Sequence, residues 1–275
     1  MIESEYLLMA FLLISMAFLV GMGTQVYRPS QTTKFHIAAR APTPTMGEWR
    51  RRSSASRRAE EERRAAAAQA VREGDALMPG ESEAIEAVGG PSAATYGEIT
   101  AKGFASLAAR LRLDSTSHFA DLGSGTGKVV LQSVQRNDVA YACGVELSPS
   151  RHAVAVAVLE HCAPHLVARV RLVNGDVADS TLWSEGGALS AVTDVYLSSL
   201  LFSPELLLRI AAALEGSQVQ QVATLRRFPS GLTGFVEEAH PEPCEMSWTM
   251  GLVLAGSGDE AWAHPGQDVY LYQRE

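Results

Sequence analysis

The sequence predicts an α/β fold in which a mostly parallel sheet is covered by helices on both faces. Three observations support this prediction. Short apolar runs of strand length alternate with helical patterns between residues 100 and 225. A glycine-rich turn at 123–127 joins the first of these runs to a helix. Acidic residues lie at or just after the ends of the first three predicted strands, as in parallel sheets that bind ligands at this edge.

The helices are expected from the spacing of apolar residues and from the residues at their ends. In the second helix, Phe104, Leu107 and Leu111 recur at helical intervals. Pro149 opens the fourth helix, because proline is favoured at the first helical position. The predicted helices span residues 81–88, 101–113, 126–135, 149–162 and 204–214.

The strands are expected where short apolar runs are bounded by glycine, proline or polar residues. Two of them, 244–254 and 268–273, follow each other without a long helix between them. We therefore expect these two to form an antiparallel hairpin at the edge of the sheet. The other predicted strands span residues 118–122, 141–147, 167–173, 194–199 and 219–225.

Composition separates a basic linker from an acidic domain. Of its 275 residues, 47% are apolar and 20% are charged, and the net charge is −8. Residues 25–80 form a basic, alanine-rich linker, whereas residues 81–275 form an acidic globular domain. Because phosphate contacts are made by lysine and arginine, the acidic domain is not expected to have a strong nucleic-acid site. It suits a basic peptide instead.

An uncharged apolar run at residues 6–22 predicts a transmembrane anchor within residues 1–24. Basic residues follow this run from Arg28 onward, whereas two glutamates precede it. This bias places the globular domain on the cytosolic side of a membrane. A removed targeting peptide or a wrongly assigned start of the chain is the alternative, with the nucleus or an organelle as the location.

Cysteine and histidine usage predicts neither disulfides nor a metal site. Cys143, Cys162 and Cys244 show no paired spacing, which is typical of a reduced compartment. His161 and His165 lie close to Cys162, but at a helix end, where we interpret all three as structural residues.

The residues around the glycine-rich turn indicate the kind of ligand. The segment reads Asp-x-Gly-x-Gly-x-Gly, with Asp121 ahead of the glycines. An acid there repels a pyrophosphate but suits the cationic sulfonium and amino group of S-adenosylmethionine. Glu146, at the end of the second strand, is expected to hold a ribose diol. Asp176 and Val177, after the third strand, are expected to contact adenine.

Several motifs together resemble one methyltransferase family. The early motifs are Tyr96-Gly97-Glu98, the turn 121–128 and Gly144-Val145-Glu146. Later segments agree, at 202–205 and 247–249, as does Gly175-Asp176 followed by Trp183. The chain thus resembles the non-SET histone-lysine N-methyltransferases of the disruptor-of-telomeric-silencing type, which methylate a lysine on the nucleosome core face.

This resemblance implies a Rossmann-like class I methyltransferase fold, S-adenosyl-L-methionine as cofactor and a protein substrate that presents a lysine. Tyr96 and Glu98 would close over the methionine part of the cofactor. Trp248 and Tyr270 would wall a narrow channel for the lysine side chain. The cofactor-binding positions that it implies are Tyr96, Glu98, Asp121, Gly123, Gly125, Gln132, Glu146, Asp176 and Val177.

The chain departs from the family pattern at the end of the fourth strand. The family has two asparagines beside the reacting amine, where this chain has Ser198-Ser199. A serine hydroxyl accepts a hydrogen bond but reaches less far. Two alternatives to a histone-lysine methyltransferase therefore stay open. One is a lysine methyltransferase of a non-histone membrane or organellar protein, and the other is a catalytically silent binding module with the methyltransferase fold.

Overall fold

The computed structural model describes residues 77–249 and 266–275, all of which belong to one compact unit of the chain. The predicted anchor at 1–24 and nearly all of the predicted linker at 25–80 lie outside these residues. Within the two described ranges, no helix is both long enough and apolar enough to cross a membrane.

An eight-stranded sheet organises the described part of the chain. Its parallel strands are β1 (His118–Leu122), β2 (Tyr141–Glu146), β3 (Val170–Asn174), β4 (Asp194–Leu197) and β5 (Gln221–Thr224). The strand β8 (Gln267–Arg274) pairs in antiparallel orientation with β5, with β6 (Phe235–Glu237) and with β7 (Glu242–Cys244). The order along the sheet is β3-β2-β1-β4-β5-β8-β6. The predicted mixed α/β sheet, parallel except toward its C-terminal strands, is confirmed.

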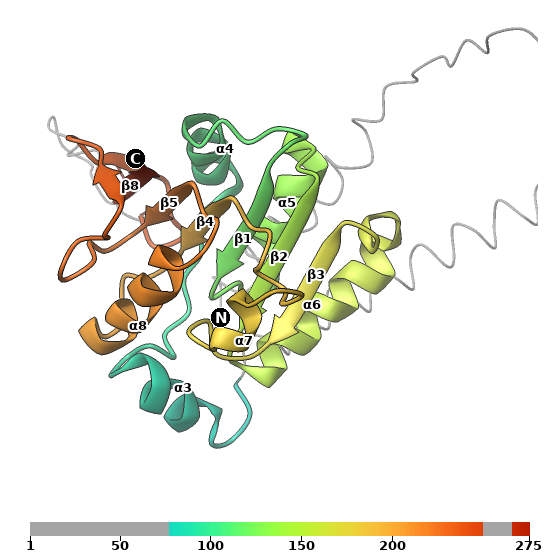
Figure 1. Ribbon diagram of the computed structural model, residues 1–275. Helices are drawn as coiled ribbons and strands as arrows, with labels where there is room; N and C mark the ends of the chain where they lie inside the picture. Colours follow the sequence, from blue (N-terminus) through green and yellow to red (C-terminus); the bar gives the residue numbers. More distant parts are fainter. Residues whose placement is uncertain (1–76, 250–265) are drawn as a thin grey trace, which may run out of the picture. The chain divides into compact units, whose positions relative to one another are not determined.

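Helices cover both faces of this sheet. The α-helices of the described residues are α3 (Glu81–Gly89), α4 (Ala101–Arg110), α5 (Lys128–Asn137), α6 (Pro149–Cys162), α7 (Ser180–Trp183) and α8 (Pro204–Glu215). On one face, α5 contacts β1, β2 and β3, while α6 contacts β2 and β3. On the other face, Leu207 and Ile210 of α8 pack in a core with Leu122 and Leu197. Figure 1 shows α3 and α7 beyond the C-terminal ends of β1 and β3, which the arrowheads mark.

The sheet separates two apolar layers, and this separation positions the acid at the end of β1. Leu122 faces the α8 layer. Phe119 faces the other layer, with its ring centroid 5.7 Å from that of Phe104 in α4. Because alternate residues of a strand share a face, Asp121 projects to the same side as Phe119. It therefore lies beneath the turn that leads into α5.

Most predicted helices and strands form, several with shifted ends. β1 spans the predicted residues, and so does α6, which Ser148 caps by accepting a hydrogen bond from Arg151 N at 3.2 Å. α5 begins two residues later than predicted, because Gly127 has a φ of 78°. This left-handed conformation keeps the chain in the turn until Lys128.

The C-terminal strands differ from the prediction. The sequence predicts a strand that begins at Cys244. In the structure β7 ends at this residue instead, and a turn follows at 246–249. β8 forms as predicted, but it lies between β5 and β6 rather than at the sheet edge. β6 has no counterpart among the predicted strands, because its three residues are too short a run to show alternation.

Candidate functional site

A pocket opens at the carboxyl edge of the sheet, next to α3 and the glycine-rich turn. Its apolar wall includes Ile85 and Val88 of α3 and Leu206 of α8. The fold brings most of the predicted site to this pocket. The predicted site residues that line it are Tyr96, Gly123, Gly125, Glu146, Asp176, Val177 and Ser198.

The turn after β1 depends on its glycines. Gly123, Gly125 and Gly127 have φ values of 91°, 53° and 78°, which side chains rarely adopt. A Cβ on Gly125 would also lie 3.0 Å from the Tyr96 ring. The turn and this tyrosine therefore pack together without room for a side chain between them.

Glu146 is held by backbone donors on both of its carboxylate oxygens. Oε2 accepts from Gly125 N at 2.8 Å, and Oε1 accepts from Ser148 N at 2.8 Å. The side chain lines the pocket and is 6% exposed. An ionised carboxylate offers about four acceptor sites, so about two stay available for donors in the pocket. This arrangement suits a pair of ligand hydroxyls.

Asp121 is buried under the same turn in a negative environment. It is 3% exposed, and its Oδ1 is a buried atom without a hydrogen-bond partner. Burial, and then the charges of Glu146 and Glu98, raise the pKa of Asp121 to about 8. A buried acid that repels its neighbours in this way is stabilised by a cation placed among them.

The raised pKa of Asp121 predicts a pH-dependent stability of the ligand-free protein. The folded state keeps this proton up to about pH 8, whereas the unfolded chain releases it near the ordinary value of 3.8. The contribution of Asp121 to the unfolding free energy is therefore fully present below pH 3.8 and is lost as the pH rises toward 8. Asp121→Asn should stabilise the protein more at pH 8 than at pH 5, by on the order of 4 kcal/mol, because each pH unit between these values changes the contribution by about 1.4 kcal/mol. Urea unfolding at the two pH values measures this difference, and an equal effect at both would contradict the assignment.

The segment Tyr96-Gly97-Glu98 joins the pocket to the glycine-rich turn. The Tyr96 hydroxyl donates to Glu98 Oε1 and lies 3.2 Å from Thr126 Oγ1. Glu98 Oε2 accepts from Lys128 Nζ at 2.5 Å, so this carboxylate is directed toward the start of α5. Tyr96, in contrast, lines the pocket.

Trp248 packs against the same segment. A Cβ on Gly97 would come within 2.6 Å of the Trp248 ring, so the indole lies directly on this glycine. Ser247 N donates to Glu98 O at 2.8 Å, and Glu98 N donates to Ser247 Oγ at 3.1 Å. The indole is therefore positioned beside the pocket by two hydrogen bonds between Ser247 and the backbone of Glu98.

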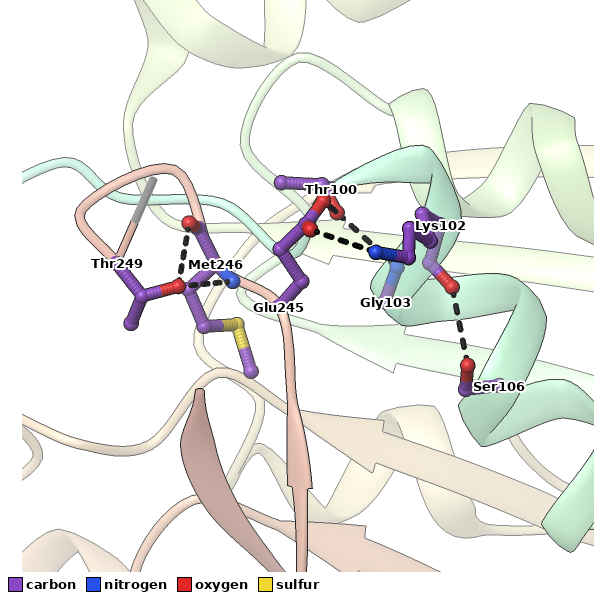
Figure 2. Close-up of polar contacts among 7 residues, drawn as sticks. All are labelled: Thr100, Lys102, Gly103, Ser106, Glu245, Met246 and Thr249. Atoms are coloured by element: carbon purple, nitrogen blue, oxygen red, sulfur yellow. Dashed lines mark hydrogen bonds and ion pairs between the residues drawn. The ribbon is translucent and has the colours of Figure 1, made fainter. Parts of the chain in front are cut away.

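The turn after β7, which carries the indole, is anchored on the start of α4 (Figure 2). The Glu245 carboxylate accepts from Thr100 Oγ1 at 2.8 Å and from Lys102 Nζ at 3.2 Å. Thr249 Oγ1 closes the turn by accepting from Met246 N and donating to Met246 O, both at 3.0 Å. The C-terminal part of the domain is thereby fixed to the helix that precedes β1.

Asp176 and Val177 follow β3 and line the pocket, and their expected contact with adenine stays a prediction. The Val177 carbonyl accepts from Trp183 Nε1 at 2.9 Å, which fixes the backbone there. Asp176 Oδ1 accepts from Ala178 N at 2.9 Å, and its Oδ2 pairs with Arg209 Nη2 at 2.6 Å. The Arg209 contact is not predictable from the sequence, because it joins α8 to a loop 33 residues away.

Gln132 and Tyr270 do not line the pocket, and each makes a contact elsewhere. Gln132 Nε2 donates to Ala101 O at 2.9 Å, which ties α5 to α4. The Tyr270 ring lies under the Arg227 guanidinium, with the guanidinium carbon 4.5 Å from the ring centroid. The predicted roles of Gln132 in the cradle and of Tyr270 in the channel stay predictions.

Ser198 and Ser199 lie in different surroundings. Ser198 lines the pocket. Ser199 is fully buried, with its hydroxyl 2.6 Å from Thr224 Oγ1 and accepting from Arg226 N at 3.1 Å. The hydroxyl of Ser199 thus holds the end of β4 against β5, a position that favours a structural role over the predicted catalytic one.

Replacing each serine by alanine should separate these roles. Ser199→Ala leaves the Arg226 N–H without its partner and removes one of the two hydrogen bonds of the Thr224 hydroxyl, so we expect a loss of about 1–3 kcal/mol of unfolding free energy. Ser198→Ala removes no partner of a backbone N–H, so it should lower the unfolding free energy by less than Ser199→Ala does. Denaturant unfolding of the two variants tests the assignment, and equal losses would contradict it.

Arg151 is a pocket residue that the sequence analysis does not single out. It is 6% exposed, lines the pocket, and donates from Nη2 to Ala94 O at 2.7 Å. Its guanidinium carbon lies 4.8 Å from the Tyr96 ring centroid. A polar residue in the first turn of a helix is ordinary, so only the fold reveals this position. Among residues 77–249 and 266–275, no cluster of His, Cys, Asp or Glu has the makeup of a metal site.

Residues 81–168 match the family model described as "Histone methylation protein DOT1". The predicted family resemblance is confirmed by this match. The DOT1 segment contains Tyr96, Asp121 and Glu146 and ends before Ser198 and Trp248. It therefore includes the acids around the glycine-rich turn. No curated protein matches the chain.

Three solved structures are among those similar to part of this chain. An RNA methyltransferase from Salinibacter ruber in complex with S-adenosyl-L-homocysteine is 16% identical, with 62% of this chain and 89% of that chain covered and a TM-score of 0.40. The putative methyltransferase yhhF from Escherichia coli is 18% identical, with 63% and 84% covered and a TM-score of 0.43. The [4+2]-cyclase SpnF is also 18% identical, with 63% and 80% covered and a TM-score of 0.44.

Proposed function

We propose that this protein is an S-adenosylmethionine-dependent protein-lysine N-methyltransferase of the histone-lysine type. One observation carries the proposal. Asp121, Glu146 and Glu98 surround the glycine-rich turn, and Asp121 is buried with one carboxylate oxygen unpartnered and a raised pKa. Asp121 and Glu146 fit a cationic ligand, whereas Glu98 pairs with Lys128, and the DOT1 match extends over all three residues.

The chain's own residues would hold the cofactor in distinct ways. The fixed carboxylate of Glu146 would accept from the ribose hydroxyls, and the buried Val177 would contact the adenine ring. Asp121 would lie near the cationic end, and Tyr96 would close the pocket wall. When bound, S-adenosylmethionine supplies an electrophilic methyl group on a sulfonium centre.

The acceptor side would be formed by Ser198 and Trp248. Trp248 is 38% exposed and lies on Gly97 of the pocket lining, so it presents an aromatic face beside the opening. Such a face can align a lysine stem and exclude water, and this desolvation lowers the pKa of the amine. The Ser198 hydroxyl would then accept a hydrogen bond from the amine.

Two observations support alternative targets or roles. The apolar run at 6–22 supports a lysine methyltransferase anchored in a membrane, with its domain on the cytosolic side and a membrane or organellar protein as target. The structural position of Ser199 leaves Ser198 as the single serine of the pair at the pocket. That supports a catalytically silent module that binds the cofactor without transferring its methyl group.

Incubation of the full chain with methyl-labelled cofactor distinguishes these proposals. Nucleosomes and a detergent-solubilised membrane extract would be offered in parallel reactions, each with Glu146→Gln as the control for site-dependent labelling. The proposal expects labelled histone lysine. Label confined to a membrane protein would replace histone with that target, whereas cofactor binding without label in either reaction would favour the silent module.

A further inference from the structure

The carboxylate of Glu98 does not face the pocket that its neighbour Tyr96 lines. It lies instead in a polar cluster with the Tyr96 hydroxyl, Thr126 and Lys128. The Lys128 Nζ to Glu98 Oε2 distance is 2.5 Å, and Thr126 Oγ1 lies 3.4 Å from Glu98 Oε1. This cluster connects the segment 96–98 to the first residue of α5.

We propose that Lys128 and Glu98 form a positioning clip that keeps the Tyr96 wall of the pocket closed before the cofactor binds and slows its release. This inference rests on the proposed function, because it concerns the exit of S-adenosylmethionine. It assigns Lys128 a role that follows from neither the glycine-rich turn nor the family resemblance. The clip acts through Tyr96, so Lys128 is a positioning residue.

The location of Lys128 argues against an ordinary surface lysine. It is the first residue of α5, where the helix dipole disfavours a cation by about 0.3–1 kcal/mol. The first turn of α5 contains no acidic residue. Glu98 supplies that acid from a different segment. Its carboxylate both neutralises the Lys128 charge and places a negative charge near the positive end of the α5 dipole. The ion pair with Glu98 is lost when the segment 96–98 moves away.

Partial burial makes the pair more than a surface contact. The side chains of Lys128 and Glu98 are 25% and 21% exposed. The pair Arg169–Asp138, remote from the pocket, is more exposed, at 35% and 74%. Exposed pairs contribute little, whereas a charge-assisted hydrogen bond shielded from water contributes more.

The clip reaches the pocket through the rigid surroundings of Tyr96. Its hydroxyl donates to Glu98, and its ring packs against the guanidinium of Arg151 and against Gly125. Glu98 is also bonded through its backbone to Ser247, beside the indole that rests on the segment. Releasing Lys128 should therefore loosen the tyrosine and the indole together.

Hydrogen exchange and cofactor release in the full chain test the clip. Exchange of peptides covering residues 95–100 would be followed without cofactor, and release of tritiated S-adenosylmethionine would be followed into excess unlabelled cofactor. Lys128→Gln should speed both the exchange and the release about five- to tenfold. Arg169→Gln, which breaks the remote pair, should leave both unchanged. The exchanged pair Glu98→Lys with Lys128→Glu should restore slow exchange.

The outcomes separate this inference from the proposed function. If the wild-type chain binds no S-adenosylmethionine, the proposed function is refuted. The part of the inference that concerns cofactor release is then refuted as well. Binding by the wild type, with unchanged exchange and release in Lys128→Gln, would overturn the clip alone. Slower release in Lys128→Gln would also overturn it, because that result would mean that the lysine destabilises the bound cofactor.

Discussion

Replacing Glu146 by glutamine is expected to weaken S-adenosylmethionine binding by about 100-fold or more. The carboxylate accepts from Gly125 N and Ser148 N, and an amide can offer only one oxygen to these two donors. Its NH₂ group must then face a backbone N–H or turn into the pocket. Hydrogen bonds to a charged group contribute about 1.5–3 kcal/mol each, and 1.4 kcal/mol corresponds to tenfold in affinity. Losing the two hydrogen bonds from the ribose hydroxyls to the carboxylate therefore gives the expected loss of affinity of about 100-fold or more.

Calorimetric titration of the full chain with the cofactor measures this effect. Glu160→Gln serves as the matched control, because Glu160 is an exposed residue of α6 and its replacement removes the same charge from the acidic domain. Its affinity should match that of the wild type. Equal affinity of Glu146→Gln and the wild type, with both proteins folded, would remove Glu146 from the ribose site.

Replacing Gly103 by alanine is expected to destabilise the domain by about 2 kcal/mol and to displace the turn that carries Trp248. A Cβ at this position would lie 2.2 Å from Glu245 O and 3.0 Å from Glu245 N, so the backbone itself must move. Overpacking of this kind costs about 1–3 kcal/mol, and sometimes more. Alanine has a higher helix propensity than glycine, which offsets up to about 1 kcal/mol of this cost in α4. The expected net loss is therefore about 2 kcal/mol.

Thermal unfolding and tryptophan fluorescence together test this expectation. A loss of about 2 kcal/mol should lower Tm by roughly 4–8 °C in a domain of this size. Gly216→Ala is the matched control. Gly216 has a φ of −82°, and a Cβ there would lie 3.7 Å from Ala212 O, an ordinary contact. This control should be neutral or slightly stabilising. If Gly103→Ala behaves in the same way, the close contact between α4 and Glu245 is wrong.

Local sequence signals predict much of the fold because they act within one helix or strand. The apolar run of β1 and the Ser148-Pro149 start of α6 define those elements without reference to the rest of the chain. The start of α5 is misplaced because the left-handed φ of Gly127 belongs to the turn. The position of β8 between β5 and β6 depends on pairing between distant segments, which periodicity does not contain.

The acids of the site are predictable because parallel strands bring their carboxyl ends to one edge. Asp121 and Glu146 therefore meet, and the structure places both around the glycine-rich turn. The partners that orient the site are not predictable in this way. Lys128 meets Glu98 across 30 residues, and Arg209 meets Asp176 across 33.

The two serines after β4 illustrate a limit of sequence patterns. Alternation along the strand places Ser198 and Ser199 on opposite sides, but both faces of this sheet are buried. A hydrophobic pattern therefore does not indicate which hydroxyl reaches the pocket. The hydrogen bond between Ser199 and Thr224 decides the question, and it depends on β5.

The central claim is that the pocket beside the glycine-rich turn transfers a methyl group from S-adenosylmethionine to a lysine side chain. A single-turnover reaction with methyl-labelled cofactor, followed by mass spectrometry of the modified residues, tests it most directly. The account predicts label on lysine ε-amines that disappears in Glu146→Gln and persists in Glu160→Gln. Label on another residue type, or bound cofactor with no label transferred, would contradict it.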